Sequence, residues 1–229
     1  MPVPNLSEFF HTVLGKNPFP YQEKMVSGPW PDVLEIPTGL GKTASVVFAW
    51  MVKRLRGDAD TPRRLVYVLP MRVLVEQTFN EVRLWIEVLE KAGIIPGGRF
   101  SAYRLQGGAV DKDWDIYPER EAVIIGTQDQ LLSRALNRGY SMSRFRWPVH
   151  FALLNNDSLW VLDEVQLMGP GLATTAQLEA FRRHFGTVLP CRSLWMSATF
   201  NSQWLSTVDF KTTAKSLATL SLTEEDRSS

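Results

Sequence analysis

Several features that would point to a particular class of protein are scarce in this sequence. The 229-residue chain has one cysteine, Cys191, so it cannot form an internal disulfide. Its three histidines, His11, His150 and His184, lie far apart and form no spacing typical of a metal site. No apolar run approaches the ~18 residues that a membrane helix needs, and the N-terminus has no signal-peptide pattern. We therefore expect a cytoplasmic protein without disulfides or membrane spans.

Net charge is also nearly absent. The chain carries 25 Lys and Arg against 24 Asp and Glu, a formal charge of +1, so any surface that binds nucleic acid has to be local. Hydrophobic residues make up 45% and charged residues 21%, which is ordinary for a globular protein. The length suits one sizeable α/β domain or two small ones.

What the sequence does contain is an alternation of short apolar runs and longer helical patterns. The runs predict strands at Val33–Ile36, Leu65–Leu69, Phe100–Leu105, Ala122–Gly126, Leu159–Leu162 and Ser193–Met196. The helical patterns cover Lys42–Arg56, Val73–Ala92, Gln128–Asn137 and Thr174–Phe185. Because the strands are apolar almost throughout, we expect a doubly wound, mainly parallel α/β sheet, with ligands beyond the carboxyl ends of its strands.

The pattern also suggests how the chain is divided. Residues 139–156 read as a loop-rich stretch that interleaves basic and aromatic residues. Such a stretch binds nucleic-acid strands in some proteins and packs an insertion onto the domain in others. After about residue 210 the chain turns polar and ends in an acidic cluster. We expect one domain over residues 1–210 and the start of a linker over 211–229.

The strongest local signal is a glycine-containing loop, Pro37–Thr43, between an expected strand and an expected helix. Gly39 and Gly41 allow a sharp turn, so that successive backbone N–H groups can face phosphate oxygens. The helix that follows adds the positive end of its dipole at the same place. The loop therefore predicts a binding site for a nucleotide phosphate chain.

The side chains of this loop agree with that interpretation. Lys42 would balance the charge of the β- and γ-phosphates, and Thr43 would offer its hydroxyl to Mg²⁺. Thr38 completes the candidate ATP-binding residues. Ile36 departs from the general G-x-x-x-x-G-K-[ST] pattern, which has a small residue there. The competing interpretation is a glycine turn before a surface lysine.

An acidic pair follows another expected strand. Leu159–Leu162 runs directly into Asp163 and Glu164, which is the arrangement of a Walker B motif. Asp163 would hold Mg²⁺ opposite Thr43, and Glu164 would accept a proton from the attacking water or orient it. Adjacent acids also occur in solvated turns, and that alternative stays open here.

With both motifs in place, the chain resembles superfamily 2 helicases of the DExD/H type, from about Pro18 to Thr199. The other family motifs follow in order: a Q motif at Phe19–Gln22, motif Ia at Leu69–Gln77, motif Ib at Gly107–Gly108, a further nucleic-acid motif at Gly126–Leu132 and motif III at Ser197–Thr199. The resemblance implies a RecA-like lobe in which Gln22 reads the adenine edge. It also implies that Gln166, Ser197 and Thr199 couple the ATP state to strand movement.

The resemblance further implies where a nucleic-acid strand binds. Arg72, Gly107, Gly108 and Thr127 would contact its backbone, because small residues let main-chain N–H groups approach phosphates and Arg72 adds charge. The alternative is that these residues are ordinary turns at strand ends.

Motif II narrows the resemblance. It reads Asp-Glu-Val-Gln and is followed by Leu167–Leu172. With Gly126–Leu132, it is most similar to the helicase part of the CRISPR-associated helicase-nuclease of type I systems. That similarity implies single-stranded DNA, a guide-RNA surveillance complex and an HD-type nuclease domain as partners. The sequence has no His-Asp doublet, so we expect the nuclease elsewhere.

The chain ends soon after motif III, which leaves no room for the motifs of a second RecA-like lobe. Because that lobe supplies an arginine finger, we expect the isolated chain to bind nucleotide weakly and to hydrolyse it very slowly. Two other functions stay open. One is a lobe of an RNA helicase or a restriction-type translocase, and the other is a docking module whose nucleotide site is only structural.

Overall fold

The computed structural model describes residues 4–107, 109, 110, 113–140, 142–211, 216–222 and 226. Within them, eight strands form one sheet in the order β4-β3-β5-β2-β6-β7-β1-β8. The strands are β1 (Val33–Glu35), β2 (Arg64–Leu69), β3 (Phe100–Gln106), β4 (Ala109–Val110), β5 (Glu121–Thr127), β6 (Ser158–Leu162), β7 (Cys191–Ser197) and β8 (Thr219–Ser221). All neighbouring pairs are parallel except β3 and β4. The predicted doubly wound, mainly parallel α/β fold is therefore confirmed.

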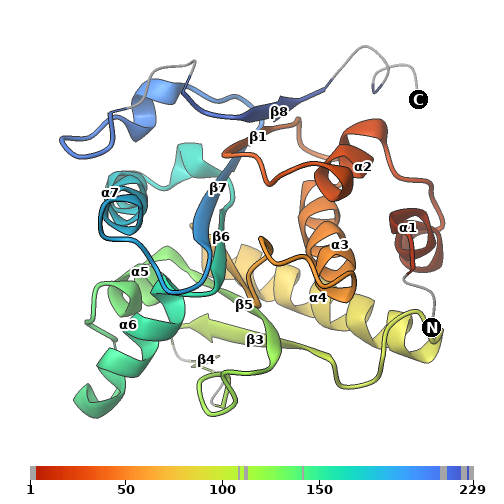
Figure 1. Cartoon of the computed structure of the whole chain (residues 1–229), viewed down its shortest axis with the longest axis horizontal. Coiled ribbons are helices and arrows are strands. Elements are labelled where there is room, and N and C mark those ends of the chain that lie inside the picture. The colour runs from red at the N-terminus through yellow and green to blue at the C-terminus, as the bar shows by residue number, and fades with distance from the viewer. Residues whose placement is uncertain are drawn as a thin grey trace.

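Helices cover both faces of the sheet (Figure 1). On one face lie α1 (Leu6–Leu14), α2 (Pro20–Ser27), α3 (Lys42–Leu55) and α4 (Arg72–Lys91). On the other lie α5 (Gln128–Ala135), α6 (Trp147–Asn155) and α7 (Pro170–Phe185). Short 3₁₀ segments occur at η1 (Arg144–Arg146), η2 (Val165–Leu167) and η3 (Ser202–Leu205). Among the described residues, no helix is long and apolar enough to cross a membrane.

The two longest helices of the first face show how sequence pattern becomes packing. In α4, most of the polar residues are exposed. The apolar residues at steps of three and four are buried against the sheet, and they are Val75, Phe79, Val82, Ile86 and Leu89. In contrast, α3 is buried on nearly all sides, because α1 and α2 cover its outer face. The predicted phosphate loop leads directly into the first turn of α3. The loop is therefore anchored to one of the most deeply buried helices of the domain.

Two expectations about irregular segments were wrong. Residues 139–156 were expected to be loop-rich, but α6 occupies their second half. Pro148 lies in the first turn of α6, where its missing N–H costs no helical hydrogen bond. The segment after residue 210 was expected to lie outside the domain, but β8 pairs with β1 in register and extends the sheet. Short helices before the loop, α1 and α2, were not predicted at all.

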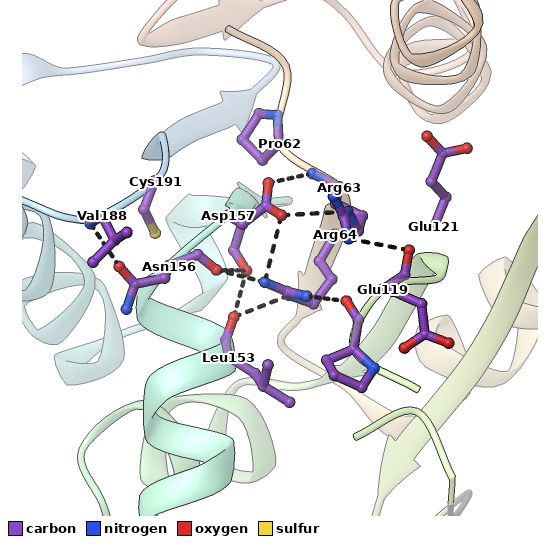
Figure 2. A network of polar contacts seen from close by, with 12 residues as sticks. Pro62, Arg63, Arg64, Glu119, Glu121, Leu153, Asn156, Asp157, Val188 and Cys191 are labelled. Atoms are coloured by element: carbon purple, nitrogen blue, oxygen red, sulfur yellow. Dashed lines mark hydrogen bonds and ion pairs between the residues drawn. The ribbon is translucent and has the colours of Figure 1, made fainter. Parts of the chain in front are cut away.

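A buried arginine at the amino end of β2 forms hydrogen bonds with the segments around it (Figure 2). Arg64, the first residue of β2, is 5% exposed. Its guanidinium donates to three carbonyl oxygens, those of Leu153 at 3.1 Å, Pro118 at 3.0 Å and Asn156 at 2.9 Å. It also lies 3.8 Å from the carboxylate of Asp157. The network fixes β2 against α6 and against the segment that leads into β5.

Candidate functional site

The predicted phosphate loop connects β1 to α3 at the carboxyl edge of the sheet. Gly39 has φ of +86° and Gly41 of +74°, values that L side chains rarely adopt. No amide group of residues 39–43 donates a hydrogen bond to another described residue. The amides near the start of α3 are therefore free to bind an anion, and the helix dipole favours one there.

Lys42 contributes a buried positive charge beside these amides. The residue is 7% exposed, and its Nζ has no hydrogen-bond partner among the described residues. It lies 3.5 Å from Oε1 of Glu164, which brings the loop and the acidic pair together. A buried ammonium without hydrogen bonds is costly. The geometry therefore fits a phosphate group that would accept hydrogen bonds from both the ammonium and the loop amides.

The two groups expected to face Mg²⁺ are linked by a tyrosine. Asp163 follows β6, and its Oδ2 accepts a hydrogen bond from the hydroxyl of Tyr67 at 2.7 Å. The same hydroxyl lies 3.2 Å from Oγ1 of Thr43. The second carboxylate oxygen, Oδ1, accepts from the backbone N–H of Glu164 at 2.9 Å. Hydroxyl and carboxylate oxygens are the ligands that Mg²⁺ prefers, so this pair fits a magnesium site.

Burial dominates the electrostatics of that pair. Burial raises the pKa of Asp163, while the hydrogen bond from Tyr67 and the charge of Lys42 act in the opposite direction. Burial and the neighbouring charge of Asp163 also raise the pKa of Tyr67 well above its ordinary value. The tyrosine is therefore a neutral hydrogen-bond donor at physiological pH.

A short polar chain runs from the acidic pair to the end of β7. Glu164 has a left-handed backbone with φ of +51°, an uncommon conformation for a non-glycine residue. The Nε2 of Gln166 donates to Glu164 Oε2 at 2.5 Å, and the hydroxyl of Ser197 donates to Gln166 Oε1 at 2.8 Å. The backbone N–H of Thr199 donates to the Ser197 hydroxyl at 3.3 Å. The three predicted coupling residues therefore form a chain of hydrogen bonds that begins at Glu164 and runs through Gln166 and Ser197 to Thr199.

Gln22 supports the loop from the other side. It is 1% exposed, and its Oε1 accepts from the backbone N–H of Phe19 at 2.8 Å. Its Nε2 donates to the Ser45 hydroxyl at 2.8 Å and to the Leu40 carbonyl at 3.3 Å. Both ends of the amide are thus engaged within the chain. That Gln22 reads an adenine edge stays a prediction, and it requires Gln22 to exchange these partners.

The predicted nucleic-acid residues lie on the adjoining part of the same edge. Arg72 is exposed at the start of α4, directly after β2, and its guanidinium lies against Gly107 at the end of β3. A Cβ at Gly107 would meet that guanidinium, so a larger residue there would displace the Arg72 side chain. Thr127 ends β5 and is 7% exposed. Gly108 lies outside the described residues.

Strand order explains how these residues divide into two groups. The phosphate loop, the acidic pair and Ser197 follow β1, β6 and β7, which are neighbours in the sheet. Arg72, Thr127 and Gly107 follow β2, β5 and β3, which are also neighbours. Parallel strands present all their carboxyl ends at one edge, so the two groups lie side by side there.

Sequence reasoning missed the tyrosines of the site. Tyr67 is the one aromatic residue in the otherwise aliphatic run Leu65–Leu69, and that contrast is the signal that could have found it. Tyr21 donates to the Leu40 carbonyl at 2.5 Å and so fixes the loop beside Gln22. The basic and aromatic stretch before α6 shows packing at one residue, because Arg146 pairs with the buried Asp115.

Comparison with known proteins agrees with this geometry. A family model described as DEAD/DEAH box helicase matches residues 17–208. No curated protein sequence matches the chain. The fold is similar to that of Mycobacterium smegmatis helicase Lhr bound to ssDNA and AMP-PNP, with a TM-score of 0.62 and 19% identity over 96% of this chain and 27% of that one.

Two further solved structures are similar. The DUF1998 helicase MrfA bound to DNA has a TM-score of 0.64 and 15% identity, over 97% of this chain and 30% of that one. Dbp5 of S. cerevisiae, bound to RNA and ADP BeF3, has a TM-score of 0.55 and 17% identity, over 88% of this chain and 46% of that one. At these identities the likeness establishes the fold, a RecA-like helicase lobe.

The chain spans 27%, 30% and 46% of the lengths of these three helicases, so each of them contains much that has no counterpart here. The family model, in contrast, covers most of the present chain. On that match, together with a phosphate loop and an acidic pair that meet at one edge of a RecA-like sheet, the chain belongs to the DEAD/DEAH box helicase family and is a helicase ATP-binding domain of the DExD/H type.

Proposed function

We propose that this chain is the first, ATP-binding lobe of an ATP-dependent DNA helicase or translocase that acts in CRISPR interference, unwinding target DNA for degradation. The observation that carries the motor part is the meeting of Lys42 with Glu164 at 3.5 Å, beside the Thr43 and Asp163 pair. Cation, free amides, hydroxyl and carboxylates then surround one small volume at the sheet edge.

Each residue has a role that its position supports. The amides of residues 39–43 and the ammonium of Lys42 bind the phosphates, with Thr38, Gly39 and Gly41 shaping the loop. Thr43 and Asp163 hold Mg²⁺, which balances the phosphate charge when bound. Glu164 orients the attacking water and accepts its proton.

The choice of DNA and of CRISPR interference rests on sequence. The motif Asp-Glu-Val-Gln, followed by Leu167–Leu172, is what resembles the type I helicase-nuclease. Two helicases of similar fold were solved with DNA, which agrees with this choice. The proposal implies a cytoplasmic enzyme whose partners are single-stranded DNA, a second RecA-like lobe, a guide-RNA surveillance complex and an HD-type nuclease domain.

The strand would run along the second group of edge residues. Arg72 offers an exposed guanidinium, and we expect Gly107, Gly108 and Thr127 to contribute main-chain N–H groups and a hydroxyl to phosphate oxygens. Such contacts do not read the base sequence, which suits a motor that moves along any strand.

Alone, the lobe should be a poor enzyme. Arginine fingers from a second lobe contribute ~10³-fold or more to the rate in related motors, so this chain should bind nucleotide and turn it over very slowly. Brisk DNA-stimulated ATPase activity of the purified chain, without any partner, would contradict this.

The test of the motor proposal compares the parent enzyme with its Lys42→Ala variant. We expect single-stranded DNA to stimulate ATP hydrolysis by the parent enzyme and the variant to lose both hydrolysis and unwinding. An unaffected variant would instead favour a docking module with a structural nucleotide site.

An RNA helicase is the second candidate, since two helicases of similar fold, Dbp5 and Mss116p, were solved with RNA. Stimulation by single-stranded RNA but not by DNA of the same sequence would favour it. Loss of CRISPR interference in cells carrying the Lys42→Ala variant would separately support the CRISPR assignment.

A further inference from the structure

A tyrosine hydroxyl is buried in the middle of an otherwise aliphatic run, Leu65–Leu69. Tyr67 is in the middle of β2 and is 0% exposed, and the residues around it in the strand are aliphatic. Its ring packs in the core between the sheet and α3. A phenylalanine would supply the same packing without burying a polar group, and burying a hydroxyl is unfavourable unless it is hydrogen bonded.

Among the residues that the structure describes, the hydroxyl hydrogen-bonds only with the two groups that the proposed function assigns to the metal. It donates to Asp163 Oδ2 at 2.7 Å and lies 3.2 Å from Thr43 Oγ1. Because the Glu164 amide occupies Asp163 Oδ1 at 2.9 Å, the carboxylate is held at both oxygens. Its rotation is therefore fixed before any ligand arrives.

The same hydroxyl also reaches Thr43. It lies 3.2 Å from Thr43 Oγ1, with the tyrosine as the donor and the threonine oxygen as the acceptor. The contact with Asp163 Oδ2 is the shorter of the two, at 2.7 Å. One tyrosine hydroxyl thus contacts both the threonine hydroxyl and the carboxylate that would share the ion.

We infer that Tyr67 is a positioning residue for the divalent cation, holding Thr43 and Asp163 in the geometry that the ion requires. The inference rests on the proposed function, since it concerns the metal that accompanies the nucleotide. Residues that hold metal ligands from behind typically change metal affinity by about 10- to 100-fold when they are replaced.

The test compares Tyr67→Phe with wild type and with Tyr103→Phe in the complete chain. Tyr103 lies on β3 and its hydroxyl has no hydrogen bond to a described residue. The control therefore removes the same hydroxyl group from a tyrosine outside the proposed metal site. Binding of a fluorescent ADP analogue is measured with EDTA and over a series of Mg²⁺ concentrations. Thermal unfolding of each protein is measured in parallel.

We expect Tyr67→Phe to bind the analogue as wild type does in EDTA, but to need about tenfold more Mg²⁺ for half of the Mg²⁺-dependent gain in affinity. Tyr103→Phe should need no more than wild type. An unchanged Mg²⁺ requirement in Tyr67→Phe overturns the inference alone. An equal loss of affinity with and without Mg²⁺ also overturns it, because that result indicates a purely structural role.

A double variant keeps the test decisive if Tyr67→Phe lowers stability. In an Asp163→Asn background, Tyr67→Phe should change the Mg²⁺ requirement less than it does in wild type, because one of the two groups that it positions is gone. Additive effects would contradict the inference. A wild-type chain that does not bind the analogue even with Mg²⁺ would overturn the proposed function, and the inference with it.

Discussion

The two ends of the parallel strands, the amino edge and the carboxyl edge of the sheet, differ in how completely their polar groups are paired. At the amino end, Arg64 is buried and its guanidinium donates to three carbonyl oxygens. At the carboxyl end, Lys42 is buried to a similar degree, but its ammonium makes no hydrogen bond within the described chain. One edge of the sheet is therefore internally satisfied, while the other keeps donors available for a ligand.

Left-handed backbone occurs at both edges. Glu164 at the carboxyl edge and Asp157 at the amino edge both have φ of +51°. A non-glycine residue in this conformation costs free energy and persists where the surrounding structure holds it in place. The difference between the two edges therefore lies in their hydrogen bonds. We expect substitutions at the amino edge to change stability without changing nucleotide binding, and substitutions at the carboxyl edge to do the reverse. The predictions below test that division, beginning with the largest effect.

Arg64→Ala should cause the largest loss of stability. It removes a buried cation that donates to three carbonyl groups and pairs with Asp157, and breaking such a network costs about 3–5 kcal/mol. Urea denaturation measures the loss. The control is Arg63→Ala, which removes a half-exposed neighbour that also pairs with Asp157 and should cost less than about 1 kcal/mol. Equal losses in the two variants would mean that the network in Figure 2 has little importance for stability.

Lys42→Ala should weaken nucleotide binding and leave stability nearly unchanged. Charge-assisted hydrogen bonds contribute about 1.5–3 kcal/mol, so nucleotide affinity should fall about 10- to 100-fold while the free energy of unfolding hardly changes. Lys53→Ala, near the other end of α3, is the matched control. Lys53 donates to the Gly28 carbonyl at 2.6 Å and pairs with Asp58, so its loss should lower stability and leave binding intact. Calorimetry and urea denaturation separate the two effects, and weaker binding in both variants would break the comparison.

The satisfied and unsatisfied edges also differ in how far sequence could predict them. The phosphate loop and the acidic pair were found because their residue types follow strands at fixed spacing, and strand order then places them together. The sequence could not show that Tyr67 links Thr43 to Asp163, because that contact joins residues 24 and 96 positions apart. The Arg64 network was missed for the same reason, since its partners come from two distant segments, at Pro118 and at Leu153–Asp157.

The irregular segments were predicted less well, for a local reason. α6 has little amphipathic pattern and begins with an aromatic residue and a proline, so its sequence resembles a loop. β8 is three residues long and mostly exposed, and only its pairing with β1 identifies it. In contrast, the stripe of α4 has a clear period and was predicted to within one residue at each end.

Gln166→Ala should have a smaller effect that distinguishes binding from coupling. It removes the hydrogen bonds to Glu164 and Ser197, each worth about 0.5–1.5 kcal/mol at most for an exposed side chain. Nucleotide affinity should stay within about threefold of wild type, corresponding to less than about 1 kcal/mol. In the parent enzyme, DNA should no longer stimulate ATP hydrolysis. Gln177→Ala, which loses only a hydrogen bond to Thr207, should keep that stimulation. If DNA still stimulates ATP hydrolysis in Gln166→Ala, the coupling role of Gln166 is wrong.

The smallest effect concerns acid sensitivity near the satisfied edge. Burial raises the pKa of Asp115, but hydrogen bonds from Arg146 and His150 outweigh burial and leave that pKa below its ordinary value. The carboxylate therefore stabilises the fold above the ordinary Asp pKa of about 4, and this contribution is lost as the pH falls through the lower folded value. The gap in unfolding free energy between wild type and Asp115→Asn should narrow as the pH falls from about 5 to about 3. His150 affects stability separately. Burial lowers its pKa below the ordinary value of about 6.5, so its protonation opposes folding as the pH falls below that value. A gap that is constant between these two acidic values would show that Asp115 contributes by packing and not by charge.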